Sequence, residues 1–142
     1  VLQPHNHELL FLGHPQGELR FREEIANYLY DSSVVRCSAS PIVLGAGTQI
    51  LVPLLFQLLT GSNYAVETPG YHRQMVVFDQ EEAQVQMLSL DRDGICMADL
   101  ENNNANVVFV TPSHQLPYGM IMPITRRTQL LQWAKKEEDR YI

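Results

Sequence analysis

Two periodicities alternate along the chain and together predict its secondary structure. Segments whose apolar residues recur every three to four positions predict helices, whereas short continuous or alternating apolar runs predict strands. Helices are predicted at 18–30, 50–59, 71–78, 97–101 and 125–138, and strands at 42–44, 64–67, 85–90 and 107–110. Because strands and helices follow one another at the spacing of βα units, we expect an α/β fold. It would have three layers, α/β/α, with helices on both faces of a mostly parallel sheet.

Pro53 stands inside the second predicted helix. A proline ring removes one backbone hydrogen-bond donor and crowds the preceding turn of a helix. We therefore expect this helix either to bend at Pro53 or to begin later than Thr48.

Both ends of the chain resemble interior points of a longer sequence. Residues 1–10 lack either periodicity, which is typical of an irregular entry segment, and the first residue is Val1. The last residues, Arg140 to Ile142, are typical of the beginning of a strand. We expect residues 1–142 to form a single, incomplete domain of a larger protein.

Composition narrows the function classes. The chain of 142 residues is 45% hydrophobic, which is enough for a core, and no run of about eighteen apolar residues predicts a membrane span. Its net charge is −6 with only ten Lys and Arg, so we do not expect this segment to contact DNA directly. The two cysteines, Cys37 and Cys96, lie far apart and fit reduced thiols of a cytoplasmic protein.

Three of the five histidines, His5, His7 and His14, lie in the first fifteen residues. A His-x-His pair is able to ligate a metal, but no cysteine or carboxylate cluster beyond Glu8 accompanies this one. We interpret the segment as a solvated tail and predict no metal site.

Three turns at the carboxyl ends of predicted strands are the places where a ligand of an α/β sheet would bind. The first, residues 45–49, joins a strand to a helix start, where free N–H groups and the Thr48 hydroxyl suit a phosphate. Glycine turns serve plain chain geometry as often, so this turn alone leaves both interpretations open.

The second and third turns carry larger side chains. In residues 67–71, Tyr71 is placed to stack on a planar cofactor or, alternatively, to pack on its own helix. In residues 111–119, hydroxyl, imidazole and amide groups are concentrated in one proline-rich loop after a buried strand. That composition favours binding, because such groups are costly to bury without partners.

These turns, in this order, resemble the fold-type I pyridoxal-phosphate proteins, and specifically the aminotransferase-like (class I/II) domain of MocR regulators of the GntR family. The resemblance runs from about Phe11 to the end of the chain. It is carried by the entry and helix at 15–17 and 21–25, the phosphate turn at 47–49, the aromatic turn at 69–71, and the signature at 111–115.

The resemblance implies an incomplete large domain of a type I aminotransferase, with pyridoxal 5'-phosphate as the cofactor of the complete protein. The backbone of Ala46 and Gly47 and the hydroxyl of Thr48 would receive the cofactor phosphate. Tyr71 would stack on the pyridine ring. His114 would line the side of the ring that bears the phenolic oxygen.

The sequence also departs from the family pattern. Leu116 stands where conventional aminotransferases carry an asparagine, which favours a regulator, and Leu12 lies near the usual place of a tyrosine that reaches the partner's phosphate. The family's Schiff-base lysine follows beyond Tyr141, whereas the only lysines, Lys135 and Lys136, fall on the outer face of the last predicted helix. We therefore assign no catalytic residue and expect weak cofactor binding, or none, by this chain alone.

Three functions follow as hypotheses. The leading one is an effector-sensing domain that binds pyridoxal phosphate and a small amino compound and biases a winged-helix DNA-binding domain outside this chain. The second is a fragment of an aminotransferase that transfers amino groups between amino and keto acids. The third is a ligand-free scaffold that holds a dimer together. We expect a cytoplasmic homodimer, and we expect the uncovered sheet edge to pair with another copy.

Overall fold

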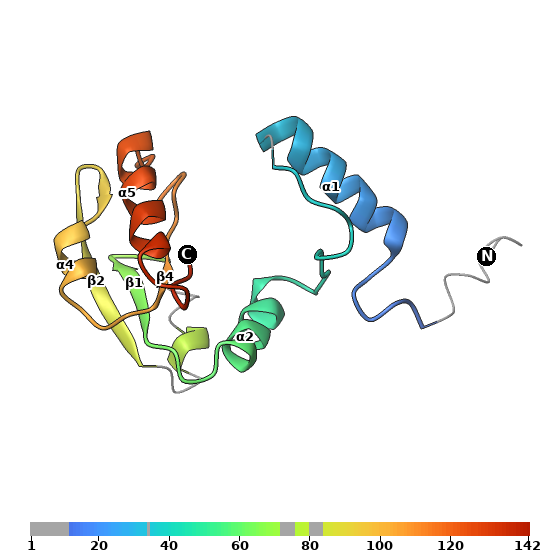
Figure 1. The fold of residues 1–142 in the computed structure, drawn as a ribbon, viewed down its shortest axis with the longest axis horizontal. Coiled ribbons are helices and arrows are strands. Elements are labelled where there is room, and N and C mark those ends of the chain that lie inside the picture. Colours follow the sequence, from blue (N-terminus) through green and yellow to red (C-terminus); the bar gives the residue numbers. More distant parts are fainter. Residues whose placement is uncertain (1–11, 34, 72–75, 80–83) are drawn as a thin grey trace, which may run out of the picture. The chain divides into compact units, whose positions relative to one another are not determined.

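The computed structural model describes residues 12–33, 35–71, 76–79 and 84–142. These residues belong to two compact units, Val1–Leu51 and Val52–Ile142, and each is described by itself (Figure 1). His5 and His7 lie outside the described residues. In the part of the chain that is described, no group of three or more His, Cys, Asp or Glu lies together as metal ligands would.

The first unit contains helix α1, Leu19–Ser33, which confirms the helix predicted at 18–30. The buried side chain of Arg22 fixes it to its surroundings by donating hydrogen bonds to the carbonyl oxygens of Gly17 at 3.0 Å and Ala39 at 2.7 Å. The strand predicted at 42–44 is wrong, because the described part of this unit contains no second strand with which it could pair. Instead, the Leu44 N–H bonds to the carbonyl oxygen of Gln16 at 2.9 Å.

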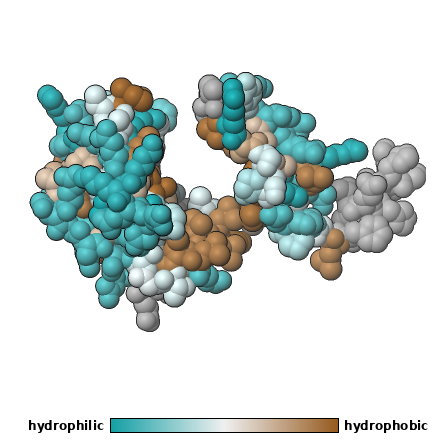
Figure 2. All heavy atoms as spheres, viewed as in Figure 1, coloured by the Kyte–Doolittle hydropathy of each residue, from teal (hydrophilic) through white to brown (hydrophobic). Residues whose placement is uncertain are grey.

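Helix α2, Thr48–Leu58, begins at Thr48 with Pro53 in its interior. The expectation of a later start is therefore wrong, while the expected bend at Pro53 stays a prediction. None of its side chains is buried, and Leu54, Leu55 and Leu58 are exposed. Figure 2 shows apolar side chains gathered over this helix. Of the described helices, none is both long and apolar enough to cross a membrane.

The second unit is built on a four-stranded sheet in the order β3-β2-β1-β4. Its strands are β1, Tyr64–Thr68; β2, Val85–Asp91; β3, Gly94–Ile95; and β4, Val107–Phe109. β1 pairs in parallel with both β2 and β4, which confirms the mostly parallel sheet, and the strand expected at the end of the chain begins with a parallel bridge between Val107 and Tyr141. The antiparallel strand β3 was not predicted, because two residues are too short for a periodicity.

Helices cover both faces of this sheet. On one face, Ala65, Leu88 and Val108 pack with residues of α4, Met97–Glu101, and α5, Ile124–Lys135. On the other face, Phe78 of the helical residues 76–79 and Phe56 of α2 pack on the strands. The three-layer α/β architecture is thereby confirmed. Of the helix predicted at 71–78, residues 72–75 lie outside the described residues, and Tyr71 is not helical.

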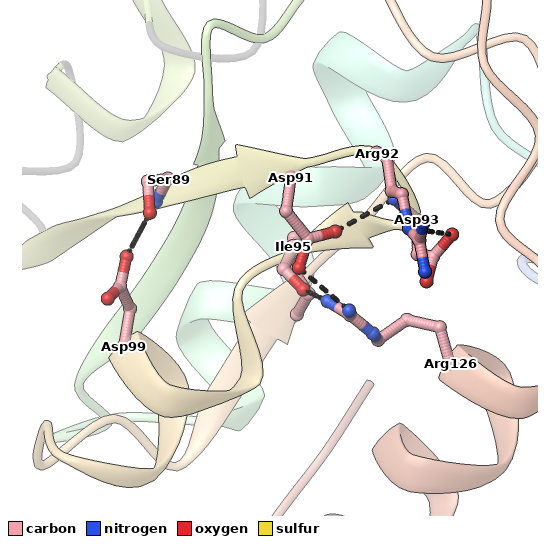
Figure 3. Close-up of polar contacts among 7 residues, drawn as sticks. All are labelled: Ser89, Asp91, Arg92, Asp93, Ile95, Asp99 and Arg126. Atoms are coloured by element: carbon pink, nitrogen blue, oxygen red, sulfur yellow. Dashed lines mark hydrogen bonds and ion pairs between the residues drawn. The ribbon is translucent and has the colours of Figure 1, made fainter.

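Polar contacts tie α4 and α5 to the sheet (Figure 3). Asp99 on α4 accepts hydrogen bonds from the hydroxyl and the N–H of Ser89, the latter at 3.1 Å. Arg126 on α5 donates to the carbonyl oxygen of Ile95 and forms an ion pair with Asp91 at 2.8 Å. Partial burial opposes the charge on Asp91, but the bonds from Arg126 and the backbone outweigh it and lower the pKa of this carboxyl.

The Asp99 contact predicts a pH-dependent stability. The hydrogen bonds from the Ser89 hydroxyl and then the Ser89 N–H hold the pKa of Asp99 below its ordinary value. A lowered pKa stabilises the fold above the unfolded value of about 3.9, and this contribution is lost progressively as the pH falls from that value through the lower pKa of the folded state. Asp99→Asn is therefore expected to lower the urea midpoint near neutral pH, with a deficit that shrinks below about pH 4. A deficit that is constant with pH would contradict the assignment.

Candidate functional site

The loops that follow β1 and β4 leave the sheet side by side. The two strands are parallel neighbours, with Tyr64 opposite Val107 and Val66 opposite Phe109. Their carboxyl ends therefore lie at one edge of the sheet, where ligands of α/β proteins bind. The turn at 67–71, which begins within the last two residues of β1, carries Tyr71, and the loop at 110–119 carries His114. The sequence prediction that both turns lie beyond strands is confirmed.

Glu67 joins these loops at their base. Its side chain is buried at the end of β1, and its Oε1 accepts a hydrogen bond from the N–H of Thr111 at 3.0 Å. A buried carboxyl group with a backbone partner is more firmly placed than an exposed one, because losing that partner would leave a buried polar group without a hydrogen bond. The start of the second loop is thus attached to the end of the neighbouring strand.

Gln115 makes a second connection, farther along both loops. Only 1% of this residue is exposed, and its Nε2 donates hydrogen bonds to the carbonyl oxygens of Pro69 at 2.8 Å and Leu116 at 2.6 Å. Its Oε1 is buried with no hydrogen-bond partner. Pro69 lies two residues before Tyr71, so this amide connects the loop of His114 directly to the loop of Tyr71.

Arg127 on α5 fixes the same loop from the helix side. Its guanidinium donates to the carbonyl oxygens of Met122 and Pro112, both at 2.9 Å, and to the Ser113 hydroxyl at 3.2 Å. The Met122 N–H also bonds to the Pro112 carbonyl oxygen at 2.9 Å. Hydrogen bonds to a charged donor are stronger than those between neutral groups. The loop is therefore held at several points although most of its residues are exposed.

Tyr71 and His114 project from this supported frame. Tyr71 is 42% exposed, which leaves part of its ring available for a ligand. His114 is exposed and has a φ of 57°, the one positive φ outside glycine among the described residues. Such a conformation is uncommon for a residue with a side chain, and surrounding contacts must maintain it. The bonds of Arg127 to Pro112 and Ser113, and those of Gln115 to Pro69 and Leu116, hold the chain before and after His114.

The predicted phosphate turn forms the start of α2. Gly47 has a φ of 92°, and its carbonyl oxygen accepts the N–H groups of Ile50 and Leu51, both at 3.2 Å. The N–H groups of Thr48 and Gln49 therefore lie at the open end of the helix, where anions bind. Ala46, Gly47 and Thr48 are all exposed. A side chain at Gly47 would meet no atom within 4 Å, so the space beside this turn is open.

Each of these features, taken by itself, has the chemistry that one group of pyridoxal phosphate would need. The helix start and the Thr48 hydroxyl suit a phosphate, and the partly exposed aromatic ring of Tyr71 suits a planar ring. The lysines do not fit its aldehyde. Lys136 forms an ion pair with Glu101 at 3.2 Å, and Lys135 is exposed at the end of α5.

Sequence reasoning named Tyr71 and His114 but missed the residues that support them. No supporting role was predicted for three residues that lie in a strand end, a loop and a helix: Glu67, Gln115 and Arg127. Glu67 gave one signal, because it is a charged residue at the end of a short strand that is otherwise apolar. Gln115 was included in the signature at 111–115, but its burial was not predicted, since it depends on Pro69, 46 residues away.

Solved structures with the same fold are aminotransferases. Kynurenine aminotransferase of Pyrococcus horikoshii, determined in complex with PMP, superposes with a TM-score of 0.83 at 23% sequence identity. The match covers 98% of this chain and 36% of that one. The chain therefore has the fold of part of a pyridoxal-phosphate-dependent transferase.

The chain belongs to the aminotransferase class I and II family, whose sequence profile matches residues 3–140. It is 38% identical over 138 residues to the uncharacterized HTH-type transcriptional regulator YdeL of Bacillus subtilis. It is 34% identical over 127 residues to the HTH-type pyridoxine biosynthesis transcriptional regulator PdxR of Corynebacterium glutamicum. These matches cover 96% and 87% of this chain but 30% and 27% of the relatives. The resemblance to the aminotransferase-like domain of regulators is confirmed.

Proposed function

We propose that this chain is part of the effector-sensing domain of a MocR-type transcriptional regulator. In the full-length protein, the domain would bind pyridoxal phosphate and a small amino compound and would bias a DNA-binding domain that lies outside this chain. One observation carries the proposal. Sequence identity of 38% over nearly the whole chain links it to an HTH-type regulator, and the relative is more than three times as long as the matched segment.

The site residues have the following roles in this proposal. The N–H groups at the start of α2, with Ala46, Gly47 and the Thr48 hydroxyl, hold the phosphate. Tyr71 stacks on the ring, and His114 lies beside it. Pyridoxal phosphate supplies an aldehyde that reacts with amines, which is how the domain would recognise an amino compound. A lysine outside this chain would be needed to hold the cofactor covalently.

An aminotransferase is the second candidate. The fold favours it, because the superposed solved structure is an enzyme of that class. Leu116 disfavours it, since the residue is 50% exposed and apolar at the position where the enzymes place a polar side chain near the ring. The two functions differ in turnover, and the binding of the cofactor alone does not separate them.

The proposal also includes the location and assembly of the full-length protein, which we expect to be a cytoplasmic homodimer. Helix α2 supports it, because an apolar helix with no buried side chain needs a cover, and a second copy or the remainder of the protein would supply one. The edge of the sheet beyond β4 is occupied by a single bridge at Tyr141, so it too has backbone groups available for pairing. Light scattering on the full-length protein tests the dimer, and a monomer would contradict it.

The decisive experiment is an absorbance titration with pyridoxal phosphate of this chain and of the full-length protein side by side. We expect a protein-bound cofactor band in the full-length protein and a much weaker one, or none, in this chain. Addition of amino donors and keto acids then separates the candidates. A regulator shows a spectral change without turnover, whereas sustained turnover would overturn the sensor in favour of the enzyme. The absence of a band in both proteins would favour the third hypothesis, a ligand-free scaffold that holds a dimer together.

A further inference from the structure

We infer that Gln115 is a positioning residue, whose buried side chain couples the loop of Tyr71 to the loop of His114 and thereby sets where the cofactor ring lies. The coupling itself concerns only this chain, while its effect on the cofactor rests on the proposed function.

The orientation of this amide is fixed by its partners. Both atoms within hydrogen-bonding distance are carbonyl oxygens, of Pro69 and Leu116, and only the NH₂ group of a glutamine is able to donate to them. Because two carbonyl acceptors engage Nε2, a flipped amide would place its oxygen against both of them. The NH₂ group of Gln115 therefore joins the two loops.

The backbone of Gln115 is also engaged, but within its own loop. Its N–H bonds to the carbonyl oxygen of Met120 at 3.1 Å, and its carbonyl oxygen accepts the N–H of Gly119 at 2.5 Å. The residue thus closes its own turn through the main chain and reaches the other loop through the side chain. A shift of Pro69 would be transmitted to the turn that carries His114.

A single contact would allow the two loops to rotate about each other, but there are two. Glu67 and Thr111 are joined at the base of the loops, and Gln115 and Pro69 are joined farther out. Two separated attachments fix both the distance and the relative orientation of the segments. Tyr71 and His114 are both exposed, and each lies in one of the two segments that this frame joins.

The buried Oε1 of Gln115 has no hydrogen-bond partner, so an apolar side chain would fill this space at a lower cost in free energy. A buried acceptor without a donor costs free energy, and an apolar side chain of the same length would avoid that cost. Gln115→Met keeps the length and volume, removes the unpartnered oxygen and removes both donated bonds. This variant is expected to fold, and it separates the coupling from the packing.

The matched control is Asn106→Leu at the opposite edge of the sheet. The Asn106 side chain also connects distant segments, accepting from the Asn63 N–H at 2.8 Å and donating to Ser62 Oγ at 3.3 Å and the Asp139 carbonyl oxygen at 3.2 Å. It lies at the amino ends of β1 and β4, away from the loops of Tyr71 and His114. Its loss affects connections of the same kind without touching the proposed site.

The experiment measures amide hydrogen exchange and the dissociation constant for pyridoxal phosphate in the full-length protein and both variants. Gln115→Met is expected to speed exchange in both loops, 67–71 and 115–120, and to raise the dissociation constant about tenfold. Asn106→Leu is expected to speed exchange only near 62–64 and 106–108 and to leave the constant within about twofold.

Two results would overturn the inference. Faster exchange in 115–120 alone would show that Gln115 does not couple the loops. An equal rise of the dissociation constant in both variants would show that the residue acts only through general stability. If the wild-type protein takes up no cofactor, the proposed function fails, and the exchange data still decide whether the coupling exists.

Discussion

Trp133→Ala is expected to destabilise the chain by about 3–5 kcal/mol, the usual range for deleting a large buried aromatic side chain. Trp133 is 1% exposed and belongs to the cluster between α5 and the sheet, with Leu88, Leu100 and Val108. Arg140 lies over its ring, 4.7 Å from the centroid, and the tryptophan carbonyl oxygen accepts a bond from the same guanidinium at 3.2 Å. The substitution therefore leaves a cavity and removes the stacking partner of Arg140.

Leu131→Ala is the control for this prediction. Leu131 lies on the same helix two residues earlier but is 57% exposed, so its truncation is expected to change stability by only about 0.5 kcal/mol. Urea unfolding of the two variants measures both effects, and the helix propensity that alanine gains over tryptophan is too small to offset the loss expected at Trp133. Equal losses would mean that α5 does not pack on the sheet through Trp133. The comparison thus tests the layer arrangement on which the candidate site depends.

The sequence predicted the elements whose signals are local. The run Val107 to Val110 is apolar throughout, and a strand of a parallel sheet covered on both faces has that composition, so its prediction was correct. The run at 42–44 has the same composition but forms no strand. A strand requires a neighbour for its backbone groups, and the pattern of one segment contains no information about whether such a neighbour exists.

The residues of the candidate site also differ in whether a local sequence pattern indicates them. Tyr71 and His114 could be predicted as loop residues, because turn chemistry and the ends of apolar runs mark the carboxyl edge of a parallel sheet. Their support could not be predicted, since the bond from Gln115 to Pro69 forms only when two distant loops leave neighbouring strands. Gln115 is thereby buried although polar loop residues are usually exposed.

Gly47→Ala is expected to weaken pyridoxal phosphate binding by the full-length protein about tenfold or more, because it disturbs the start of α2. The φ of 92° at Gly47 is one that residues with a side chain rarely adopt, and forcing an alanine into it costs about 1–2 kcal/mol. The backbone relieves that strain by turning toward a negative φ. This rotation moves the N–H groups of Thr48 and Gln49 away from the position in which they would donate to a phosphate.

Gly61→Ala is the control that separates the effect of backbone strain on stability from the effect on cofactor binding. Gly61 has a φ of 83°, and a side chain at Gly61, as at Gly47, meets no atom within 4 Å, so the two alanines carry the same kind of backbone strain without a clash. Gly61 follows α2, whereas Gly47 precedes it. Both variants are expected to lose similar stability in thermal unfolding, but only Gly47→Ala is expected to raise the dissociation constant of the cofactor. If both raise it equally, the effect is one of stability, and the glycine turn before α2 serves chain geometry alone.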